Sequence, residues 1–428
     1  MGTIAFHTLG CKLNFAESSD LMRRFGEKGY VQVDFRQKAD VYVINTCTVT
    51  QTAEKKCRNA IRQAHRVNPD AIVAVIGCFS QVKAEDIEKI EGVNIILGND
   101  NKHKLLEYVL NSTDNNGKEN HVEDISRQKD FHISYSSDDR TRSFLKVQDG
   151  CDYFCSYCEI PFARGRNRSA GIDDICNCAR QLAREGKKEI VLTGVNIGEY
   201  GSERGETFLQ LIRSLDEINE INRYRISSIE PNLISERIID FCGSSRSFLP
   251  HFHIPLQAGT DKILALMKRK YTRELFANRV EYIKNSMPHA FIAADVIVGF
   301  PQETDEDFAS ARDFIASLPL SALHVFTYSE RPGTVAARMH GKVPFSKRKE
   351  RSLELQRLSE RKKEEFCLNN MGTEREILWE ADCDKGLMYG FTDNYIRVGR
   401  KFDARYINTI TKERLETYDR ENKHYIIN

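Results

Sequence analysis

Three cysteines stand close together near the middle of this 428-residue chain. Cys151, Cys155 and Cys158 follow the spacing C-x3-C-x2-C, and no further Cys or His occurs until Cys176. Three thiolates at this spacing suit a soft metal ion or an iron–sulfur cluster. A structural zinc site normally has a fourth ligand nearby, whereas three ligands on a four-iron cluster leave one iron open for another molecule. The spacing favours such a cluster; a zinc site completed from elsewhere in the fold and accidental clustering are the alternatives.

Three more cysteines, Cys11, Cys47 and Cys78, stand directly after apolar runs in the first 111 residues. The runs are 4–9, 41–45 and 72–77. Each is followed by a helical pattern, which predicts strand–helix units of a parallel sheet. The turns after parallel strands meet at the ligand-binding edge of such a sheet. We therefore expect the three thiols to converge, although burial as packing residues explains any one of them alone.

The chain divides into segments of different pattern. Residues 1–111 predict a parallel α/β domain, and the polar segment 112–139 predicts a linker. Residues 140–370 contain about six strand–helix units, too few for a complete eight-stranded barrel. Residues 371–428 consist of short alternating runs with Gly and Asn turns, which predict a small antiparallel β-barrel. The predicted fold class is α/β, with a partial (βα)6 barrel at its centre.

The composition is that of a soluble globular protein, with 40% hydrophobic and 29% charged residues. No apolar run is long enough to span a membrane, and the N-terminus MGTIAFHTLGCKLN lacks an export signal. Twelve cysteines without such a signal indicate metal or redox chemistry and not disulfides. We expect a cytoplasmic protein without membrane contact.

The segments VQDGCDYFCSYC and IPFARGR resemble the methylthiotransferase branch of the radical S-adenosylmethionine superfamily. The resemblance implies that the central cysteine trio holds a 4Fe–4S cluster whose open iron chelates the methionine part of S-adenosylmethionine. LGCKLN, NTCTVT and VIGC resemble the N-terminal domain of that branch. There, Cys11, Cys47 and Cys78 would hold a second 4Fe–4S cluster, which supplies or carries the sulfur to be inserted. The last domain resembles TRAM, an RNA-binding module.

The resemblance also implies a pocket for S-adenosylmethionine at the carboxyl ends of the barrel strands. Asn196 and Glu230 would face the methionine or ribose groups, and the backbone around Val298 would flank the adenine. Amide, carboxylate and hydroxyl groups can satisfy a zwitterion and a ribose diol, although loop capping explains any single one equally well. The residues expected in this pocket are Tyr157, Gly194, Asn196, Ser228, Glu230, Gln257 and Val298.

The net charge of +1 does not indicate a nucleic-acid-binding protein, so any RNA contact must come from local patches. The run Lys268–Lys270 is one such patch, and Tyr395 offers a ring for base stacking. A solvated surface is the alternative for each. The side chains expected to contact RNA are Arg164, Arg166, Arg331, Arg397, Arg400 and Lys401.

LGCKLN is closer to the branch that acts on threonylcarbamoyladenosine in tRNA than to the GCQMN of isopentenyladenosine enzymes or the GCPKN of the ribosomal-protein enzyme. The resemblance therefore implies an enzyme that places a methylthio group on carbon 2 of that nucleoside, next to the anticodon. The expected partners are the tRNA anticodon stem-loop and an electron donor such as flavodoxin or ferredoxin, and the expected state is a monomer. A sibling enzyme and a zinc-dependent RNA-binding protein without catalysis are the alternatives.

Overall fold

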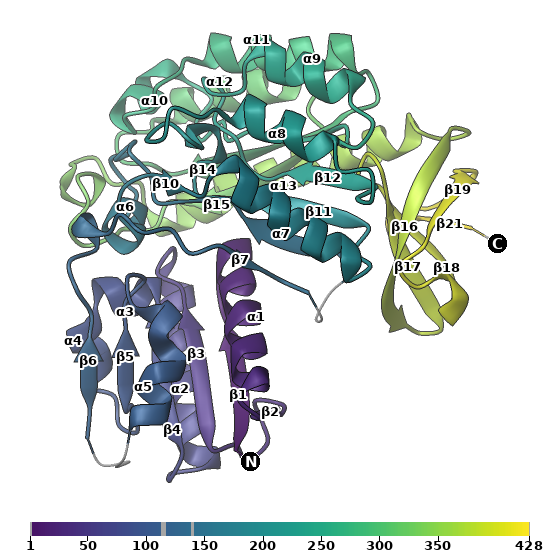
Figure 1. Ribbon diagram of the computed structural model, residues 1–428. Helices are drawn as coiled ribbons and strands as arrows, with labels where there is room; N and C mark the ends of the chain where they lie inside the picture. The colour runs from purple at the N-terminus through teal and green to yellow at the C-terminus, as the bar shows by residue number, and fades with distance from the viewer. Residues whose placement is uncertain (1, 113–116, 138–140, 428) are drawn as a thin grey trace.

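The computed structural model describes residues 2–112, 117–137 and 141–427. It has three regions (Figure 1): an N-terminal α/β domain, a central half-barrel covered by helices, and a C-terminal β-sheet at the side of the barrel. The predicted fold class is confirmed. Among the described residues, no helix has both the length and the apolar character needed to cross a bilayer.

The N-terminal sheet has the strand order β2-β1-β3-β4-β5-β6, and all its pairs are parallel. Its strands are β1 (Thr3–Thr8), β2 (Val31–Gln32), β3 (Val41–Thr46), β4 (Ile72–Gly77), β5 (Ile95–Leu97) and β6 (Glu119–His121). Its helices are α1 (Lys12–Glu27), α2 (Gln51–Val67), α3 (Cys78–Val82), α4 (Ala84–Glu88) and α5 (Leu105–Asn111). Strand β3, with the sequence VYVINT, is buried along its whole length because hydrophobic clusters cover both faces of the sheet.

The segment predicted to be a linker is built into two sheets. Strand β6 extends the N-terminal sheet, and β7 (Ser134–Tyr135) pairs antiparallel with the first barrel strand. The prediction of a loose linker is therefore wrong for these residues, because their pairing is set by neighbouring strands and not by their own polar composition. Residues 113–116 and 138–140, which include the predicted boundary at 140, lie outside the described residues.

The central region has six parallel strands, as predicted. They form two sheets, β12-β11-β8-β7 and β13-β14-β15, which isolated bridges at Tyr224–Phe248 and Ser228–His253 connect. The parallel strands are β8 (Ser143–Lys146), β11 (Glu189–Thr193), β12 (Arg223–Ile226), β13 (His251–His253), β14 (Phe291–Val298) and β15 (Ala322–Thr327). The covering helices are α7 (Ile172–Arg184), α8 (Phe208–Asp216), α9 (Glu236–Ser244), α10 (Asp261–Leu266), α11 (Arg273–Ser286) and α12 (Asp305–Ser317).

Helix α13 (Phe345–Leu368) leads to the C-terminal sheet, whose order is β19-β16-β17-β18-β21-β20. Its strands are β16 (Glu374–Asp384), β17 (Leu387–Thr392), β18 (Arg397–Lys401), β19 (Ile410–Arg414), β20 (Thr417–Asp419) and β21 (His424–Ile426). The pairs are antiparallel except β18–β21, which is parallel. Trp379 is fully buried and belongs to the same hydrophobic cluster as Phe291 and Ala322 of the barrel. This shared core anchors the C-terminal domain to the barrel strands.

Candidate active site

The central cysteine trio lies in a loop that β9 (Gln148–Asp149) and β10 (Arg168–Ser169) close by antiparallel pairing. Gly150 makes the turn possible, because it has a φ of 71° and a Cβ there would lie 1.9 Å from the carbonyl oxygen of Arg166. Burial, followed by the nearby Cys155, raises the pKa of the Cys158 thiol to about 12. Burial also raises the pKa of the Cys151 thiol, and Glu199, Cys158 and Cys155 add to the shift.

A buried arginine that sequence reasoning did not place in the site contacts this trio. Arg269 Nη1 donates to Cys155 Sγ at 3.0 Å, and Arg269 Nε donates to the hydroxyl of Tyr271 at 3.1 Å. Its Nη2 pairs with the carboxylate of Glu230. The run Lys268–Lys270 was predicted as a local basic patch for RNA, and it lies between helices α10 and α11.

The three cysteines of the N-terminal trio stand at the turns after three neighbouring strands of the sheet. Cys11 caps α1, Cys47 directly follows β3, and Cys78 begins α3. Gly10, with a φ of 109°, packs so closely on the next strand that a Cβ there would lie 3.2 Å from Cys47 Sγ. Burial raises the pKa of Cys47 to about 12, with Cys78 and then Cys11 also contributing. Strand geometry thus brings together thiols that are far apart in the sequence.

One cavity of about 270 Å³ lies beside the central trio, where the barrel meets the N-terminal domain. Thr48, the neighbour of Cys47, lines it from the N-terminal domain, and Cys158 lines it from the barrel loop. The hydroxyl of Thr48 donates to Glu159 Oε2 at 3.1 Å, so the two cysteine-bearing segments are in direct contact. The other lining residues are Val49, Thr50, Tyr157, Glu159, Ile160, Gln257, Asp295, Ile297, Phe326, Thr327, Tyr328, Ser329 and Arg331.

Arg331 belongs to this cavity and not to the outer surface. Its side chain is 3% exposed, and its Nη1 donates to Glu54 Oε1 at 2.8 Å. Its Nε and Nη2 are buried without a hydrogen-bond partner. Arg331 is therefore placed to contact a molecule inside the cavity, and its contact with RNA stays a prediction for a nucleoside that enters there.

Arg164 was predicted to contact RNA, and its burial contradicts that prediction. Its side chain is 1% exposed, and its Nη1 donates to Glu17 at 3.2 Å and to Asp149 at 3.0 Å. Its Nη2 donates to Asn14 Oδ1 at 2.5 Å. Glu17 and Asn14 lie on α1, so Arg164 joins the barrel loop to the N-terminal domain.

The residues predicted to bind S-adenosylmethionine lie at the carboxyl ends of the strands, but they differ in which of their atoms a ligand could contact. Asn196 Nδ2 lies 4.0 Å from Cys151 Sγ, and its Oδ1 is buried without a partner. Tyr157 and Gln257 line the cavity. The side chain of Val298 packs in the hydrophobic core, so only its backbone is free to face a ligand.

Gly194 and Ser228 occupy tighter positions. A Cβ at Gly194 would lie 2.7 Å from Gln148 Oε1, which accepts hydrogen bonds from the next two backbone amides. Ser228 is held by its bridge to His253. At both positions the backbone lies at the end of a strand, where a ligand could contact it. Ser228 adds a small hydroxyl side chain.

The other side chains predicted to bind RNA differ in availability. Arg166 is 61% exposed, and Arg397 and Lys401 are exposed on β18. Arg400 is half-buried, with its guanidinium 3.6 Å from the ring centre of Tyr406. Tyr395 packs against Phe391, Phe291 and Arg225, so its ring is not a free platform for a base.

The sequence profile of the Radical SAM superfamily matches residues 145–315, and that of a group described as "Uncharacterized protein family UPF0004" matches residues 3–98. A similar solved structure is the radical S-adenosylmethionine methyltransferase TsrM from Kitasatospora setae with cobalamin and a [4Fe-4S] cluster bound. It has a TM-score of 0.58 and 16% identity, and the match covers 79% of this chain and 77% of that one.

Curated relatives match almost the whole chain. Threonylcarbamoyladenosine tRNA methylthiotransferase MtaB of Bacillus subtilis is 40% identical over 97% of this chain and 94% of the relative. The protein of the same name from Aquifex aeolicus is 39% identical over 93% and 96%. The tRNA-2-methylthio-N(6)-dimethylallyladenosine synthase of Acetivibrio thermocellus is 33% identical over 96% and 88%.

The half-barrel, the cysteine loop and the superfamily match define a radical S-adenosylmethionine enzyme. This class implies S-adenosylmethionine and a 4Fe–4S cluster, and the three free thiols of the loop fit such a cluster. Because the similarity to methylthiotransferases extends over nearly the whole length, the chain belongs to the radical S-adenosylmethionine methylthiotransferase family.

Proposed function

We propose that the protein transfers a methylthio group to carbon 2 of threonylcarbamoyladenosine, next to the anticodon of tRNA. The observation that carries the proposal is the direct contact between the two cysteine-bearing segments, in which Thr48 donates to Glu159 beside a cavity that Cys158 lines. The substrate is supported by the relatives with 39–40% identity, which are named for this nucleoside.

The proposed ligands of the two 4Fe–4S clusters are Cys151, Cys155 and Cys158 for one and Cys11, Cys47 and Cys78 for the other. The first three cysteines would hold a cluster that supplies one-electron reduction of S-adenosylmethionine, and the resulting radical chemistry can open the aromatic C–H bond at carbon 2, which acid–base side chains cannot do. All six cysteines are free thiols, and N–H groups donate to the sulfurs of all except Cys11 among the contacts of the described residues, as Asn99 Nδ2 does to Cys78 Sγ at 3.4 Å.

The remaining side chains bind, orient and exclude water. Asn196 Oδ1 has no partner beside Cys151, so it can accept a hydrogen bond from the amine of S-adenosylmethionine. The buried Nε and Nη2 of Arg331 make no hydrogen bond, although Nε lies 4.0 Å from Glu159 Oε2, and they can donate to an anionic or carbonyl oxygen in the cavity. Tyr157 and Phe326 give the cavity an apolar wall, which keeps water from a reactive intermediate.

Nucleoside mass spectrometry tests the substrate. The chain should be expressed in a host that lacks its own threonylcarbamoyladenosine methylthiotransferase, and the tRNA digested. The methylthio derivative of threonylcarbamoyladenosine is expected, while isopentenyladenosine is unchanged. Methylthiolation of isopentenyladenosine, or of a ribosomal protein, with no change in threonylcarbamoyladenosine would assign the chain to a sibling activity instead.

The variant Cys11→Ala tests the division of labour between the trios. Cleavage of S-adenosylmethionine is expected to continue, because Cys151, Cys155 and Cys158 are untouched, while methylthiolated tRNA disappears. Deoxyadenosine and methylthiolated nucleoside are measured in the same reaction. Methylthiolation that persists in this variant would show that the N-terminal trio does not serve sulfur insertion.

The partners follow from the proposed reaction. The tRNA anticodon stem-loop is the substrate, a flavodoxin- or ferredoxin-type protein supplies the electron, and the enzyme acts as a monomer in the cytoplasm. The proposed RNA contacts are Arg166 together with Arg397 and Lys401 of β18, which are exposed. Arg400 is the least available of the proposed contacts, since it pairs with Glu413 at 3.7 Å.

A further inference from the structure

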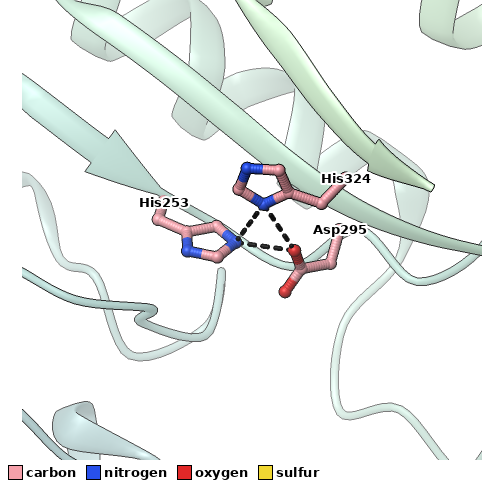
Figure 2. Close-up of side chains that lie close together, drawn as sticks. All are labelled: His253, Asp295 and His324. Atoms are coloured by element: carbon pink, nitrogen blue, oxygen red, sulfur yellow. Dashed lines mark hydrogen bonds and ion pairs between the residues drawn. The ribbon is translucent and has the colours of Figure 1, made fainter. Parts of the chain in front are cut away.

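Two histidines and an aspartate meet on neighbouring barrel strands (Figure 2). His253 ends β13, Asp295 lies in β14 and His324 lies in β15. Asp295 and His324 are directly opposite in the parallel register, and His253 is opposite Ala293, two residues before Asp295. Because side chains two residues apart share a face of a sheet, the three side chains project from the same face.

That face is the one turned to the active-site cavity. Asp295 and Ile297 line the cavity, whereas Val296 and Val298 of the same strand point into the hydrophobic core under the helices. His253 and Asp295 are mostly covered, and His324 is 51% exposed. Three paired strands therefore hold the cluster rigidly on one side, and its other side is accessible to a ligand.

The two ring nitrogens and the carboxylate oxygen are as close to one another as donor atoms that bind a single metal ion. His253 Nε2 lies 2.7 Å from Asp295 Oδ1, and His324 Nδ1 lies 3.1 Å from the same oxygen. The two ring nitrogens are 3.3 Å apart. Donors bound at about 2.0–2.2 Å from one ion in tetrahedral or octahedral geometry are roughly 3 Å apart. Figure 2 shows both rings and the carboxylate directed toward one common point.

We propose that His253, Asp295 and His324 bind one divalent first-row transition-metal ion. Two imidazole nitrogens and one carboxylate oxygen form a donor set that suits Mn²⁺, Fe²⁺ or Zn²⁺, in contrast to the thiolate sets of the two cysteine trios. The ion would keep open coordination positions on the accessible side, where oxygen donors of a molecule in the cavity could complete its shell. The site is separate from both cysteine trios and does not depend on the proposed tRNA substrate.

The test is a Mn²⁺ titration of the full-length, anaerobically reconstituted protein, followed by electron paramagnetic resonance without tRNA or S-adenosylmethionine. The protein is kept oxidised, so that its 4Fe–4S clusters are diamagnetic and the six-line signal reports free Mn²⁺ alone. Wild-type protein is expected to remove one Mn²⁺ per chain from solution. Asp295→Asn keeps the shape and hydrogen-bonding capacity of the side chain but loses the carboxylate, and it is expected to weaken binding at least tenfold.

Two further measurements show whether the Mn²⁺ binds at this cluster. His324→Ala is expected to weaken binding as Asp295→Asn does, while His340→Ala, a change at an exposed histidine outside the cluster, leaves it unchanged. One equivalent of Zn²⁺ is expected to release the bound Mn²⁺, because imidazole sites prefer Zn²⁺. Iron content equal to wild type confirms that each variant is folded.

The proposal is overturned if wild-type protein takes up no more Mn²⁺ than Asp295→Asn does. It is also overturned if Zn²⁺ fails to displace Mn²⁺, since the ion would then sit on oxygen ligands elsewhere. In either case the three side chains form a hydrogen-bonded triad in which Asp295 accepts from both histidines. Because neither readout uses tRNA, failure here leaves the proposed function standing.

Discussion

At the scale of single residues, the contact between Arg269 and Cys155 is the one that most directly tunes the proposed chemistry. A buried guanidinium that donates to a cysteine sulfur at 3.0 Å stabilises negative charge on that sulfur. A cluster gains negative charge when it is reduced, so hydrogen bonds to its sulfurs raise its reduction potential. Glu230 holds the guanidinium in place by an ion pair.

Arg269→Gln is expected to make the cluster on this trio harder to reduce. Loss of one charge-assisted hydrogen bond is worth about 1.5 kcal/mol, which corresponds to a shift of roughly −60 mV for a one-electron couple. A redox titration followed by electron paramagnetic resonance measures the shift. Lys270→Gln is the matched control, because that ammonium lies 4.0 Å from the ring centre of Tyr153. An unchanged potential at full iron content would contradict the role of Arg269.

Asn196→Ala is expected to weaken binding of S-adenosylmethionine about tenfold, since a buried hydrogen bond to a charged group is worth about 1.5 kcal/mol. Its Oδ1 is buried beside Cys151 without a partner, so it is free for a ligand. Equilibrium binding to the reconstituted protein measures the effect. Asn177→Ala, on the exposed side of α7, should bind as wild type does. Equal affinity in both variants would remove Asn196 from the pocket.

At the scale of elements, a buried ionic network joins helix α1 to the barrel loop. Arg164 pairs with Glu17 of α1 and with Asp149 of β9, and Lys146 of β8 pairs with both carboxylates at 2.9 and 2.7 Å. Arg164, then Lys102 and Lys146, hold the pKa of Glu17 well below its usual range, although burial and the Asp149 carboxylate would raise it. The network fixes the distance between the segments that carry Cys11 and Cys151.

Arg164→Ala is therefore expected to destabilise the protein by about 3 kcal/mol, because the buried carboxylates of Glu17 and Asp149 lose a cation that balances their charge. Arg166→Ala changes the same residue type two positions away, and at 61% exposure it should have an effect near zero. Chemical denaturation compares the two, and hydrogen exchange should show opening at α1. Equal stability of both variants would mean that the network does not hold the domains together.

Strand β18 offers two exposed cations for RNA. The double variant Arg397→Ala with Lys401→Ala is expected to weaken tRNA binding several-fold and to reduce its salt dependence, because fewer counterions are released. Arg405→Ala is the matched control, since its guanidinium is already paired with Asp403 at 2.6 Å. The measurement is the affinity of each variant for tRNA at several salt concentrations. Unaltered affinity and salt slope in the double variant would place the RNA on another face.

At the scale of the whole molecule, the alternation of apolar runs and helical patterns predicted the parallel strands of both α/β regions. The position of Cys11, Cys47 and Cys78 after strands predicted their convergence, because strand ends are fixed by local sequence. The two strands inside the polar segment 112–139 could not be predicted in this way. Their pairing depends on β5 and β8, which supply the partner backbone.

The predictions about arginines failed for a different reason. Arg164 looks like part of a basic surface motif, but its partner Glu17 lies 147 residues away. Arg269 stands in a run of three basic residues, and only the fold turns it toward Cys155. Burial of a long charged side chain depends on distant partners, and composition and spacing carry no information about such pairs.

The measurement that tests the central claim most directly is iron per chain in the anaerobically reconstituted protein and in two triple variants. Wild-type protein is predicted to hold about eight irons. Replacement of Cys11, Cys47 and Cys78 by Ala, or of Cys151, Cys155 and Cys158 by Ala, is predicted to leave about four in each case. Only the first of these variants should still cleave S-adenosylmethionine. Zinc in place of iron, or a triple variant that keeps the full iron content, would contradict two separate clusters, one on each cysteine trio.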